Sequence, residues 1–271
     1  MKITFLRSAT LVLQSGDNTI LLDPMLGAAG SLTPFSVFRH KARRNPLVNL
    51  PANAAALLNT VTHGLITHCQ KGHFDHLDKS GRELLSGKKI PTYCREDDAK
   101  YLTRRGFSIT ALVTGQRQPF LSGFITPIPA RHGHGWIANI MGPGVGYVIE
   151  LPDEPSVYIA GDTVMTDDVH KVLTELKPDV AIVAAGNASV DVGQPILMSL
   201  AEVMEFVRLA PSVAVANHLE ALNHCPVTRV QVKEAAQQAG LLHKLSIPQD
   251  GEMLVFKRTL RFGGFSDELE R

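Results

Sequence analysis

Short runs of apolar and polar positions alternate along the first part of the chain. The runs at 3–6, 10–13 and 19–22 predict strands, with a turn at 16–18 between the last two. Residues 24 to about 58 show no such period and contain prolines at positions 24, 34, 46 and 51. We expect this stretch to be irregular, and connections of that length inside compact domains are usually functional or mobile.

From residue 64 onward, strand-like and helix-like segments alternate. Residues 77–85 predict a helix, and two capping boxes, Ser199 with Glu202 and Thr228 with Gln231, predict the starts of two more. The predicted strands are 64–67, 120–129, 145–150, 157–160, 180–183 and 213–216. A meander followed by alternating units indicates an α/β fold with a mixed sheet arrangement and helices outside.

The composition fits one globular domain better than two. The chain has 271 residues, of which 44% are apolar and 20% charged, so it can bury a core without disulfides or a structural metal. We therefore expect 1–271 to form a single domain. The formal net charge of +1 argues against a dedicated nucleic-acid binder or a binder of anionic membranes.

Three features of the sequence favour a cytoplasmic protein. The three cysteines, Cys69, Cys94 and Cys225, cannot all pair, and their spacing fits no disulfide framework. No run of about 20 apolar residues predicts a membrane span. Residues 1–7 alternate and include Arg7, which is typical of a strand and not of a signal peptide.

Ionisable residues gather where the predicted strands end. In chain order these residues are His68, His73, Asp75, His76, His132, Asp162 and His218. Strand ends that feed loops on one edge of a sheet can converge in space. Imidazole and carboxylate ligands together suit zinc and similar divalent ions. Seven ligands are too many for one ion, but they suffice for two ions that share a carboxylate.

At these motifs the chain resembles the metallo-β-lactamase superfamily over nearly its whole length. The family signature is His-x-His-x-Asp-His after a strand, followed by a later His, a later Asp and a final His. The matching segments are Thr67-His68, His73-Phe74-Asp75-His76, Pro129-Ala130-Arg131-His132, Gly161-Asp162-Thr163 and Asn217-His218. The register of the third segment favours His132 over His134 as the metal ligand. Leu22-Asp23-Pro24 resembles a further motif, whose aspartate supports the site from behind the ligands.

The resemblance implies a four-layer αββα sandwich, an α/β (α+β) fold, with two metal ions at one edge. Zinc is the expected metal, with manganese, iron or nickel as alternatives. The most similar branch contains general bacterial metal-dependent hydrolases and lactonase-like members. Redox chemistry at a di-iron site is a further option in this superfamily, but nothing in the chain suggests a flavin domain to deliver electrons.

The chain departs from the family pattern in one place. The family has a single residue between its first two histidines, whereas Cys69, Gln70, Lys71 and Gly72 lie between His68 and His73. A bulged loop would return His68 to the first metal. Alternatively, Lys71 lies near that position and weakens or empties the first metal site, because a protonated lysine cannot bind a cation.

Two other segments could contribute to the site. His224 lies shortly after His218 and could contact substrate or support a ligand, or it could simply precede the next helix. The basic run 39–44 is either a solvated loop or a lid for an anionic substrate. His40, His63, His170 and His243 lack such context, and we expect them to be solvated.

The functional prediction is a metal-dependent hydrolase. A metal-bound hydroxide at a binuclear site would attack a small ester, lactone or amide. Asp162 would bridge the ions, and Asp75 would orient the hydroxide and pass a proton to the leaving group. The alternatives are a phosphodiesterase of the same fold and a degenerate metal-binding homologue without turnover. The expected partner is a small-molecule substrate, with no nucleic acid and no membrane, and a homo-oligomer is compatible with the sequence.

Overall fold

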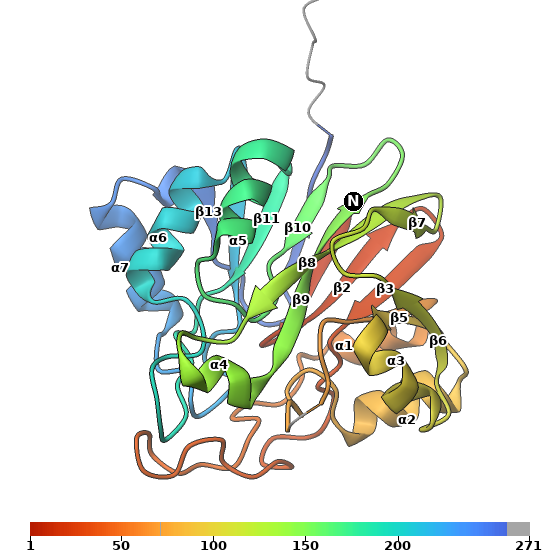
Figure 1. Cartoon of the computed structure of the whole chain (residues 1–271), viewed down its shortest axis with the longest axis horizontal. Coiled ribbons are helices and arrows are strands. Elements are labelled where there is room, and N and C mark those ends of the chain that lie inside the picture. The colour runs from red at the N-terminus through yellow and green to blue at the C-terminus, as the bar shows by residue number, and fades with distance from the viewer. Residues whose placement is uncertain (71, 259–271) are drawn as a thin grey trace, which may run out of the picture.

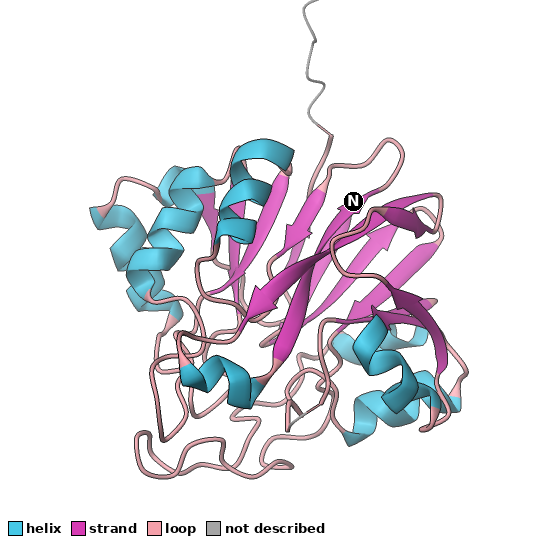
Figure 2. Ribbon diagram, viewed as in Figure 1, coloured by secondary structure: helices cyan, strands magenta, loops and turns pink. Residues whose placement is uncertain are grey.

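Two sheets pack face to face, and helices cover their outer faces (Figures 1 and 2). The protein is described here from a computed structural model, in which residues 1–70 and 72–258 are described. This arrangement is the four-layer αββα sandwich of the α/β class that the family resemblance implies. The prediction of the fold class is therefore confirmed.

The first sheet combines an antiparallel meander with a parallel half. Its strand order is β14-β1-β2-β3-β4-β5-β6. The strands are β1 (Lys2–Arg7), β2 (Thr10–Ser15), β3 (Asn18–Leu22), β4 (His63–Ile66), β5 (Pro91–Arg95), β6 (Ser108–Leu112) and β14 (Met253–Val255). Pairing is antiparallel from β14 to β3 and parallel from β3 to β6. The helices of this half are α1 (Ala54–Asn59), α2 (Lys79–Gly87) and α3 (Glu96–Thr103).

The second sheet has the same division. Its strand order is β13-β12-β11-β10-β9-β8-β7, antiparallel from β7 to β10 and parallel from β10 to β13. The strands are β7 (Gln118–Phe120), β8 (Gly123–Arg131), β9 (Pro143–Glu150), β10 (Val157–Ile159), β11 (Val180–Ala184), β12 (Val213–Asn217) and β13 (Leu245–Ser246). The helices are α4 (Trp136–Met141), α5 (Asp167–Lys171) with the π-turn Val172–Leu176, α6 (Leu200–Leu209), α7 (Arg229–Gln238) and the 3₁₀ turn Leu242–Lys244.

The apolar runs of the strands divide between two cores. In β2, Leu11 and Leu13 face the opposite sheet, whereas Val12 faces the helices of its own half. A strand that is buried on both faces needs apolar residues at consecutive positions, which explains why these runs are continuous. On the other side, helices α5 to α7 pack on the second sheet through a third apolar cluster.

Most of the predicted elements form, and two of the predictions need correction. Both capping boxes are present, at the starts of α6 and α7. Segment 120–129 is not one strand: the chain turns at Leu121, which has a φ of 52°, so that β7 and β8 form a hairpin. The irregular stretch after residue 24 ends in α1, which begins at Ala54. We did not predict this helix because prolines precede it and no side chain caps it.

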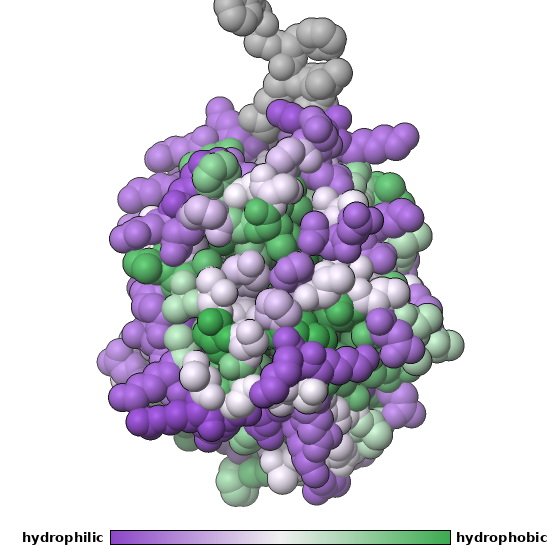
Figure 3. Space-filling view, turned by 90° about the vertical axis from the view of Figure 1, so that its right-hand side faces the viewer, coloured by the Kyte–Doolittle hydropathy of each residue, from purple (hydrophilic) through white to green (hydrophobic). Residues whose placement is uncertain are grey.

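The chain is close to electrically neutral, with a formal net charge of +1. The face in Figure 3, over α2, α3 and β6, mixes hydrophilic and hydrophobic side chains. In the described part of the chain, every helix is too short or too polar to cross a membrane.

Candidate metal centre

The predicted ligands converge at one edge of the sandwich, where loops leave both sheets. They form two groups in which the ligand atoms lie within 4.8 Å of one another. The first group, the three-histidine cluster, is His68, His73 and His132. The second group, the carboxylate cluster, is Asp75, His76, Asp162 and His218. All of these side chains are buried, so the edge holds polar groups that need partners or an ion.

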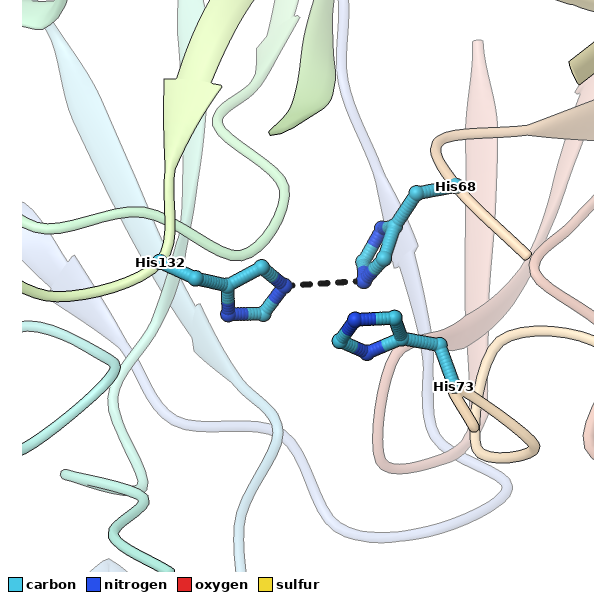
Figure 4. Close-up of side chains that lie close together, drawn as sticks. All are labelled: His68, His73 and His132. Atoms are coloured by element: carbon cyan, nitrogen blue, oxygen red, sulfur yellow. Dashed lines mark hydrogen bonds between the residues drawn. The ribbon is translucent and has the colours of Figure 1, made fainter. Parts of the chain in front are cut away.

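His68 reaches the first cluster despite the longer segment that follows it. Its Nε2 lies 2.9 Å from the Nε2 of His132, and its Nδ1 lies 3.0 Å from the Oγ1 of Thr67 (Figure 4). Two imidazole nitrogens bound to one tetrahedral zinc at about 2.0–2.1 Å are themselves about 3.3 Å apart, so only a small shift would bring these two nitrogens to the spacing that a shared ion needs. His68 therefore occupies the position that the bulged-loop alternative requires. Lys71, the other alternative, lies outside the described residues.

His73 completes this cluster from further along the same loop, which joins β4 to α2. Its ring stacks on that of His132 with centroids 4.7 Å apart, and both approach His68 in Figure 4. The Nε2 of His73 lies 3.1 Å from the carbonyl oxygen of Met141 at the end of α4. When Nε2 donates this hydrogen bond, Nδ1 is the nitrogen that can bind an ion. Gly72 turns the chain into His73 with a φ of +91°, which favours glycine.

The carboxylate cluster surrounds two imidazole nitrogens with acidic groups. The Oδ2 of Asp162 lies 3.1 Å from the Nε2 of His76 and 3.5 Å from the Nε2 of His218. The Oδ2 of Asp75 lies 3.7 Å from each of the same nitrogens. The ring centroids of His68 and His76 are 4.0 Å apart, so the two clusters are neighbours. Nitrogen and carboxylate donors in this mixture fit zinc and similar divalent ions.

Asp23 holds His76 from behind. The Oδ2 of Asp23 lies 2.8 Å from the Nδ1 of His76, which leaves Nε2 to face the carboxylates. The same carboxylate accepts hydrogen bonds from the backbone N–H and the hydroxyl of Thr67. A carboxylate on the distal nitrogen orients a ligating histidine and raises its basicity. The supporting position predicted for Asp23 agrees with these contacts.

His218 follows β12 in a left-handed backbone conformation, with a φ of 59°. Its carbonyl oxygen lies so close to Gly186 that a Cβ there would meet it at 2.3 Å, so only glycine fits. The Nδ1 of His218 lies 3.5 Å from the sulfur of Cys225, and its buried Nε2 has no hydrogen-bond partner among the described residues. An imidazole nitrogen that faces carboxylates without a hydrogen bond fits a metal ligand.

His224 contacts Cys225 and not the ligand clusters. Its Nδ1 lies 4.0 Å from the sulfur of Cys225, and its ring meets Phe35 edge to face at 5.1 Å. Burial lowers the pKa of His224, but Cys225 outweighs this effect and the pKa is raised. Burial likewise raises the pKa of the Cys225 thiol, while His224 and His218 bring it down to about 7. His224 therefore packs beside Cys225, behind His218.

Burial decides the protonation of the three-histidine cluster. It lowers the pKa of His68 well below its ordinary 6.5, and His76 and His73 lower it further. It also lowers the pKa of His73, and it brings the pKa of His132 to about 3 with a contribution from His73. Neutral imidazole is the form that binds a metal ion, so these rings are ready to act as ligands.

In the carboxylate cluster, acidic neighbours outweigh burial and raise the pKa of the histidines. Burial lowers the pKa of His76, but Asp162 and Asp23 outweigh it and raise the pKa well above 6.5. Burial raises the pKa of Asp75 and of Asp162, but His76 and His218 outweigh it, so both carboxyls are ionised at neutral pH. The metal-free cluster is thus a network of buried opposite charges.

Residues 36–39, which lead into the basic run 39–44, are anchored by a carboxylate from a distant part of the chain. The carboxylate of Asp191 accepts hydrogen bonds from Ser36 Oγ and from the backbone N–H groups of residues 37–39. The Nε2 of His40 lies 2.8 Å from the Oγ of Ser189, so His40, which we expected to be solvated, is partly exposed and has a side-chain partner. The backbone of this loop is therefore anchored beside the site while most of its basic side chains stay exposed. Sequence reasoning missed Asp191 because its partners are some 150 residues away.

His134 and the remaining histidines lie outside both clusters. His134 is exposed and 3.7 Å from Glu202, so the register that favoured His132 agrees with the structure. His170 and His243 are exposed as expected. His63 is only half-buried, at the start of β4, with its Nδ1 2.9 Å from the hydroxyl of Thr62.

An αββα sandwich with buried imidazole and carboxylate donors at one edge defines the class of metallo-β-lactamase-fold metalloproteins. A profile of the beta-lactamase superfamily domain matches residues 18–219, and the chain belongs to this superfamily. It is 31% identical to the UPF0173 protein YddR of Bacillus subtilis, over 94% of this chain and 100% of that protein.

Two solved structures resemble the chain over their full length. An isothiocyanate hydrolase from Delia radicum gut bacteria has 32% identity and a TM-score of 0.86, and the match covers 95% of this chain and 100% of that one. A possible metal-dependent hydrolase from Veillonella parvula has 27% identity and a TM-score of 0.85, over 94% and 99% of the two chains. These relatives support a metal-dependent hydrolase of this fold.

Proposed function

We propose that this protein hydrolyses a small ester, lactone or amide with two divalent metal ions, zinc being the first choice. The observation that carries the proposal is the pair of neighbouring donor sets, one of three imidazoles and one of two imidazoles and two carboxylates. Such sets suit zinc, and manganese, iron or nickel can use the same donors. A lone structural zinc would need only about four ligands.

Each of the two clusters would hold one ion. His68, His73 and His132 would hold one ion, and Asp75, His76 and His218 the other. Asp162 belongs to the second set and would be the shared carboxylate. Bound divalent ions would lower the pKa of a water molecule toward neutrality and polarise the scissile bond.

Asp75 is the residue that we assign to proton transfer. Its carboxyl is buried and ionised at neutral pH, because His76 and His218 lower its pKa by more than burial raises it. An ionised carboxylate can take a proton from the attacking water at Oδ1 or Oδ2 and return it to the leaving group. Asp162 is ionised as well, but it contacts the Nε2 of His76 more closely, at 3.1 Å.

Exposed apolar side chains beside the site favour a substrate with an apolar group. Phe74 lies inside the ligand segment and is 44% exposed. Trp136 and Ile140, on α4, are 55% and 57% exposed, and the last residue of this helix contacts His73. Large exposed apolar side chains that gather beside a polar site commonly contact a ligand.

The test is metal content together with turnover. Elemental analysis of the purified protein should find about two divalent ions per chain. A panel of small esters, lactones, amides and phosphodiesters should then show chelator-sensitive hydrolysis of the carbonyl compounds. Hydrolysis of phosphodiesters alone would favour the phosphodiesterase alternative. Metal binding without turnover on any of these after reloading would favour a degenerate homologue.

The isothiocyanate hydrolase among the relatives favours a second substrate class. Water adds to the electrophilic carbon of R–N=C=S, and the products R–NH₂ and COS balance the reaction. Both hydrogens of the water must end on the nitrogen, and carrying these protons is a role open to Asp75. We would follow amine formation from benzyl isothiocyanate beside the ester panel. Turnover of esters without any of the isothiocyanate would exclude this second candidate.

We also propose that the protein acts in the cytoplasm on a small molecule and that it binds neither nucleic acid nor a membrane. In support, the net charge is only +1 and Cys69, Cys94 and Cys225 are free. Light scattering of the purified protein would decide between a monomer and a homo-oligomer. Binding to heparin or to anionic vesicles at physiological salt would contradict the proposed partner.

A further inference from the structure

A buried thiol lies directly behind one of the ligands of the carboxylate cluster. Cys225 is 7% exposed, and the imidazoles of His218 and His224 beside it are 1% and 4% exposed. His218 is a member of the carboxylate cluster, whereas Cys225 belongs to neither donor set. Polar groups that contact a metal ligand from behind orient it and tune its basicity, so this contact bears on the metal centre.

The sulfur of Cys225 contacts the ring nitrogen of His218 that the carboxylates do not contact. It lies 3.5 Å from Nδ1, whereas the Nε2 of the same ring lies 3.5 Å from Asp162 and 3.7 Å from Asp75. A neutral imidazole that binds an ion through Nε2 carries its hydrogen on Nδ1 and needs an acceptor there. Sulfur is a weak acceptor, and among the described residues it is the hydrogen-bond partner that this nitrogen has.

The backbone holds Cys225 in this position. Its N–H donates a hydrogen bond of 3.2 Å to the carbonyl oxygen of Leu222, which closes a tight turn. The carbonyl oxygen of the preceding residue, His224, accepts a hydrogen bond of 2.9 Å from the N–H of Ser189 in the loop after β11. The thiol is therefore presented by a fixed segment of backbone, as a group that orients a ligand must be.

The same turn is fastened to the irregular stretch that precedes α1. The side chain of Asn223 accepts hydrogen bonds from the N–H of Phe35 and from the amide of Asn45, at 2.9 and 3.0 Å. It also donates one of 2.7 Å to the carbonyl oxygen of Ser36. Asn223 is buried, so these bonds are protected from water. Two separate parts of the chain thus fix the turn that carries Cys225.

Gly186, after β11, leaves the room that the contact needs. A Cβ at this position would lie 2.3 Å from the carbonyl oxygen of His218. It would also lie 3.0 Å from the Cβ of Cys225 and 3.3 Å from its sulfur. Both members of the contact therefore pack against one glycine, and a larger residue there would displace them.

Asp23 provides the parallel for this arrangement. Its carboxylate contacts the Nδ1 of His76 at 2.8 Å, so that the Nε2 of His76 faces the cluster. Cys225 holds the corresponding place behind His218, with a longer and weaker contact because sulfur replaces oxygen. Each imidazole of the carboxylate cluster thus has its own partner on Nδ1.

We propose that Cys225 is the positioning residue of His218: its sulfur accepts the Nδ1–H of this imidazole and so directs Nε2 to the metal ion of the carboxylate cluster. The proposal rests on the proposed function, because it assigns a partner to a ligand named there. Among the described residues, the hydrogen-bond partners of the thiol are His218 and His224. The effect of losing the thiol should therefore be confined to the carboxylate cluster.

Zinc affinity, measured separately for each cluster, tests the proposal. In a His68→Ala background the three-histidine cluster lacks a ligand, so the bound ion reports on the carboxylate cluster, and in a His218→Ala background the reverse holds. Competition with a chromophoric chelator should show that Cys225→Val weakens binding roughly tenfold in the first background, the usual effect of losing a partner of a ligating histidine. The second background should show no change. Equal weakening in both would mean that Cys225 only supports the fold.

Two further variants separate the hydrogen bond from the packing. Cys225→Ser keeps an acceptor on a shorter side chain and should bind zinc more tightly than Cys225→Val, which fills the space without one. Cys94→Val is the matched control, because Cys94 is also a buried free cysteine but packs in the apolar cluster under the helices of the first half. It should bind zinc as the natural chain does. If Cys225→Val does not fold, Cys225→Ala takes its place. Equal affinity of the serine and the apolar variant would overturn the proposal.

Two spectra of the metal-loaded protein test the contact itself. With zinc bound, the Nδ1–H of His218 should give a ¹⁵N–¹H signal, assigned by its loss in His218→Ala, that shifts in Cys225→Val. A signal that does not move would contradict the hydrogen bond to sulfur. With cobalt in place of zinc, we expect no sulfur-to-cobalt charge-transfer band. Such a band would show that Cys225 binds the ion itself and would overturn its role as a positioning residue.

These results are separate from turnover. If the natural chain hydrolyses the panel but the Cys225 variants bind zinc as it does, the role of Cys225 fails while the hydrolase proposal stands. If zinc binding depends on Cys225 as expected but no compound of the panel is hydrolysed, the hydrolase proposal fails while the role of Cys225 stands. A chain that binds no divalent ion would overturn both.

Discussion

The two ligand clusters are neighbours and both are buried, yet the pKa values of their histidines are shifted in opposite directions. In the three-histidine cluster no carboxylate is a member, and burial lowers the pKa of His68, His73 and His132. In the carboxylate cluster, acidic neighbours raise the pKa of His76 and His218 against the same burial. An imidazole buried alone stays neutral, whereas one buried beside carboxylates holds a proton that an incoming ion must displace.

The groups behind the ligands differ in the same way. His68 and His73 contact a hydroxyl and a backbone carbonyl, which are neutral. His76 contacts the carboxylate of Asp23. A neutral partner orients an imidazole without changing its charge, whereas a carboxylate also stabilises the charged form. The two sites should therefore respond differently to mutation and to pH.

The largest effect is expected from Asp75→Asn, which removes the proton acceptor of the carboxylate cluster. We expect kcat to fall roughly 10²- to 10⁴-fold on any carbonyl substrate that the natural chain hydrolyses, the usual range for a group that transfers a proton. Steady-state kinetics provide the measurement. Asp17→Asn, at an exposed turn, is the matched control and should keep full activity. Less than a tenfold loss would show that Asp75 does not transfer the proton.

Removing one ligand from each cluster should separate the two sites. His68→Ala should lose the ion of the three-histidine cluster, and His218→Ala that of the carboxylate cluster. Each variant should bind about one divalent ion per chain where the natural chain binds about two. Elemental analysis after gel filtration counts the ions. Complete loss of metal in either variant would mean that the clusters bind as one unit and do not act as two separate sites.

Asp23→Asn tests the charged support of His76. The amide can still contact the imidazole but carries no charge, so affinity at the carboxylate cluster should fall roughly 10- to 100-fold. Competition with a chromophoric chelator measures this affinity. Thr67→Ser keeps a hydroxyl near His68 and Asp23 and should change affinity far less. An unchanged affinity in Asp23→Asn would assign Asp23 to folding alone.

The smallest expected effect concerns pH, through the number of protons that the protein releases when a metal ion binds. At pH 6.5 the histidines with raised pKa, His76 and His218, are protonated in the metal-free protein. Those with lowered pKa, His68, His73 and His132, are neutral. An ion bound by His76 and His218 must displace their protons, so His68→Ala should release about two protons per ion and His218→Ala almost none.

Calorimetry of zinc binding in buffers of different ionisation enthalpy counts these protons. As pH rises above the raised pKa values, the number released by His68→Ala should fall toward zero. Equal proton release from both variants at pH 6.5 would contradict the electrostatic difference between the clusters.

Much of the fold was predictable because its signals are local. Apolar runs placed strands at β1 to β4 and β9 to β12, and capping boxes placed the starts of α6 and α7. The predicted ligands all follow strands, and parallel strands carry their ends to one edge. Short elements such as α1 and α4, with no side-chain cap, left no comparable signal.

By itself, the sequence determined which residue types stand at the strand ends, and it predicted from them a set of metal ligands large enough for two ions. Only the tertiary structure decided how they divide into a neutral cluster and a charged one, because burial and neighbouring charges come from packing. It also decided that Gln70 contacts Asp98 and that Asp191 anchors residues 36–39. Such contacts join segments far apart in the chain, and no local pattern of apolar and polar positions encodes them.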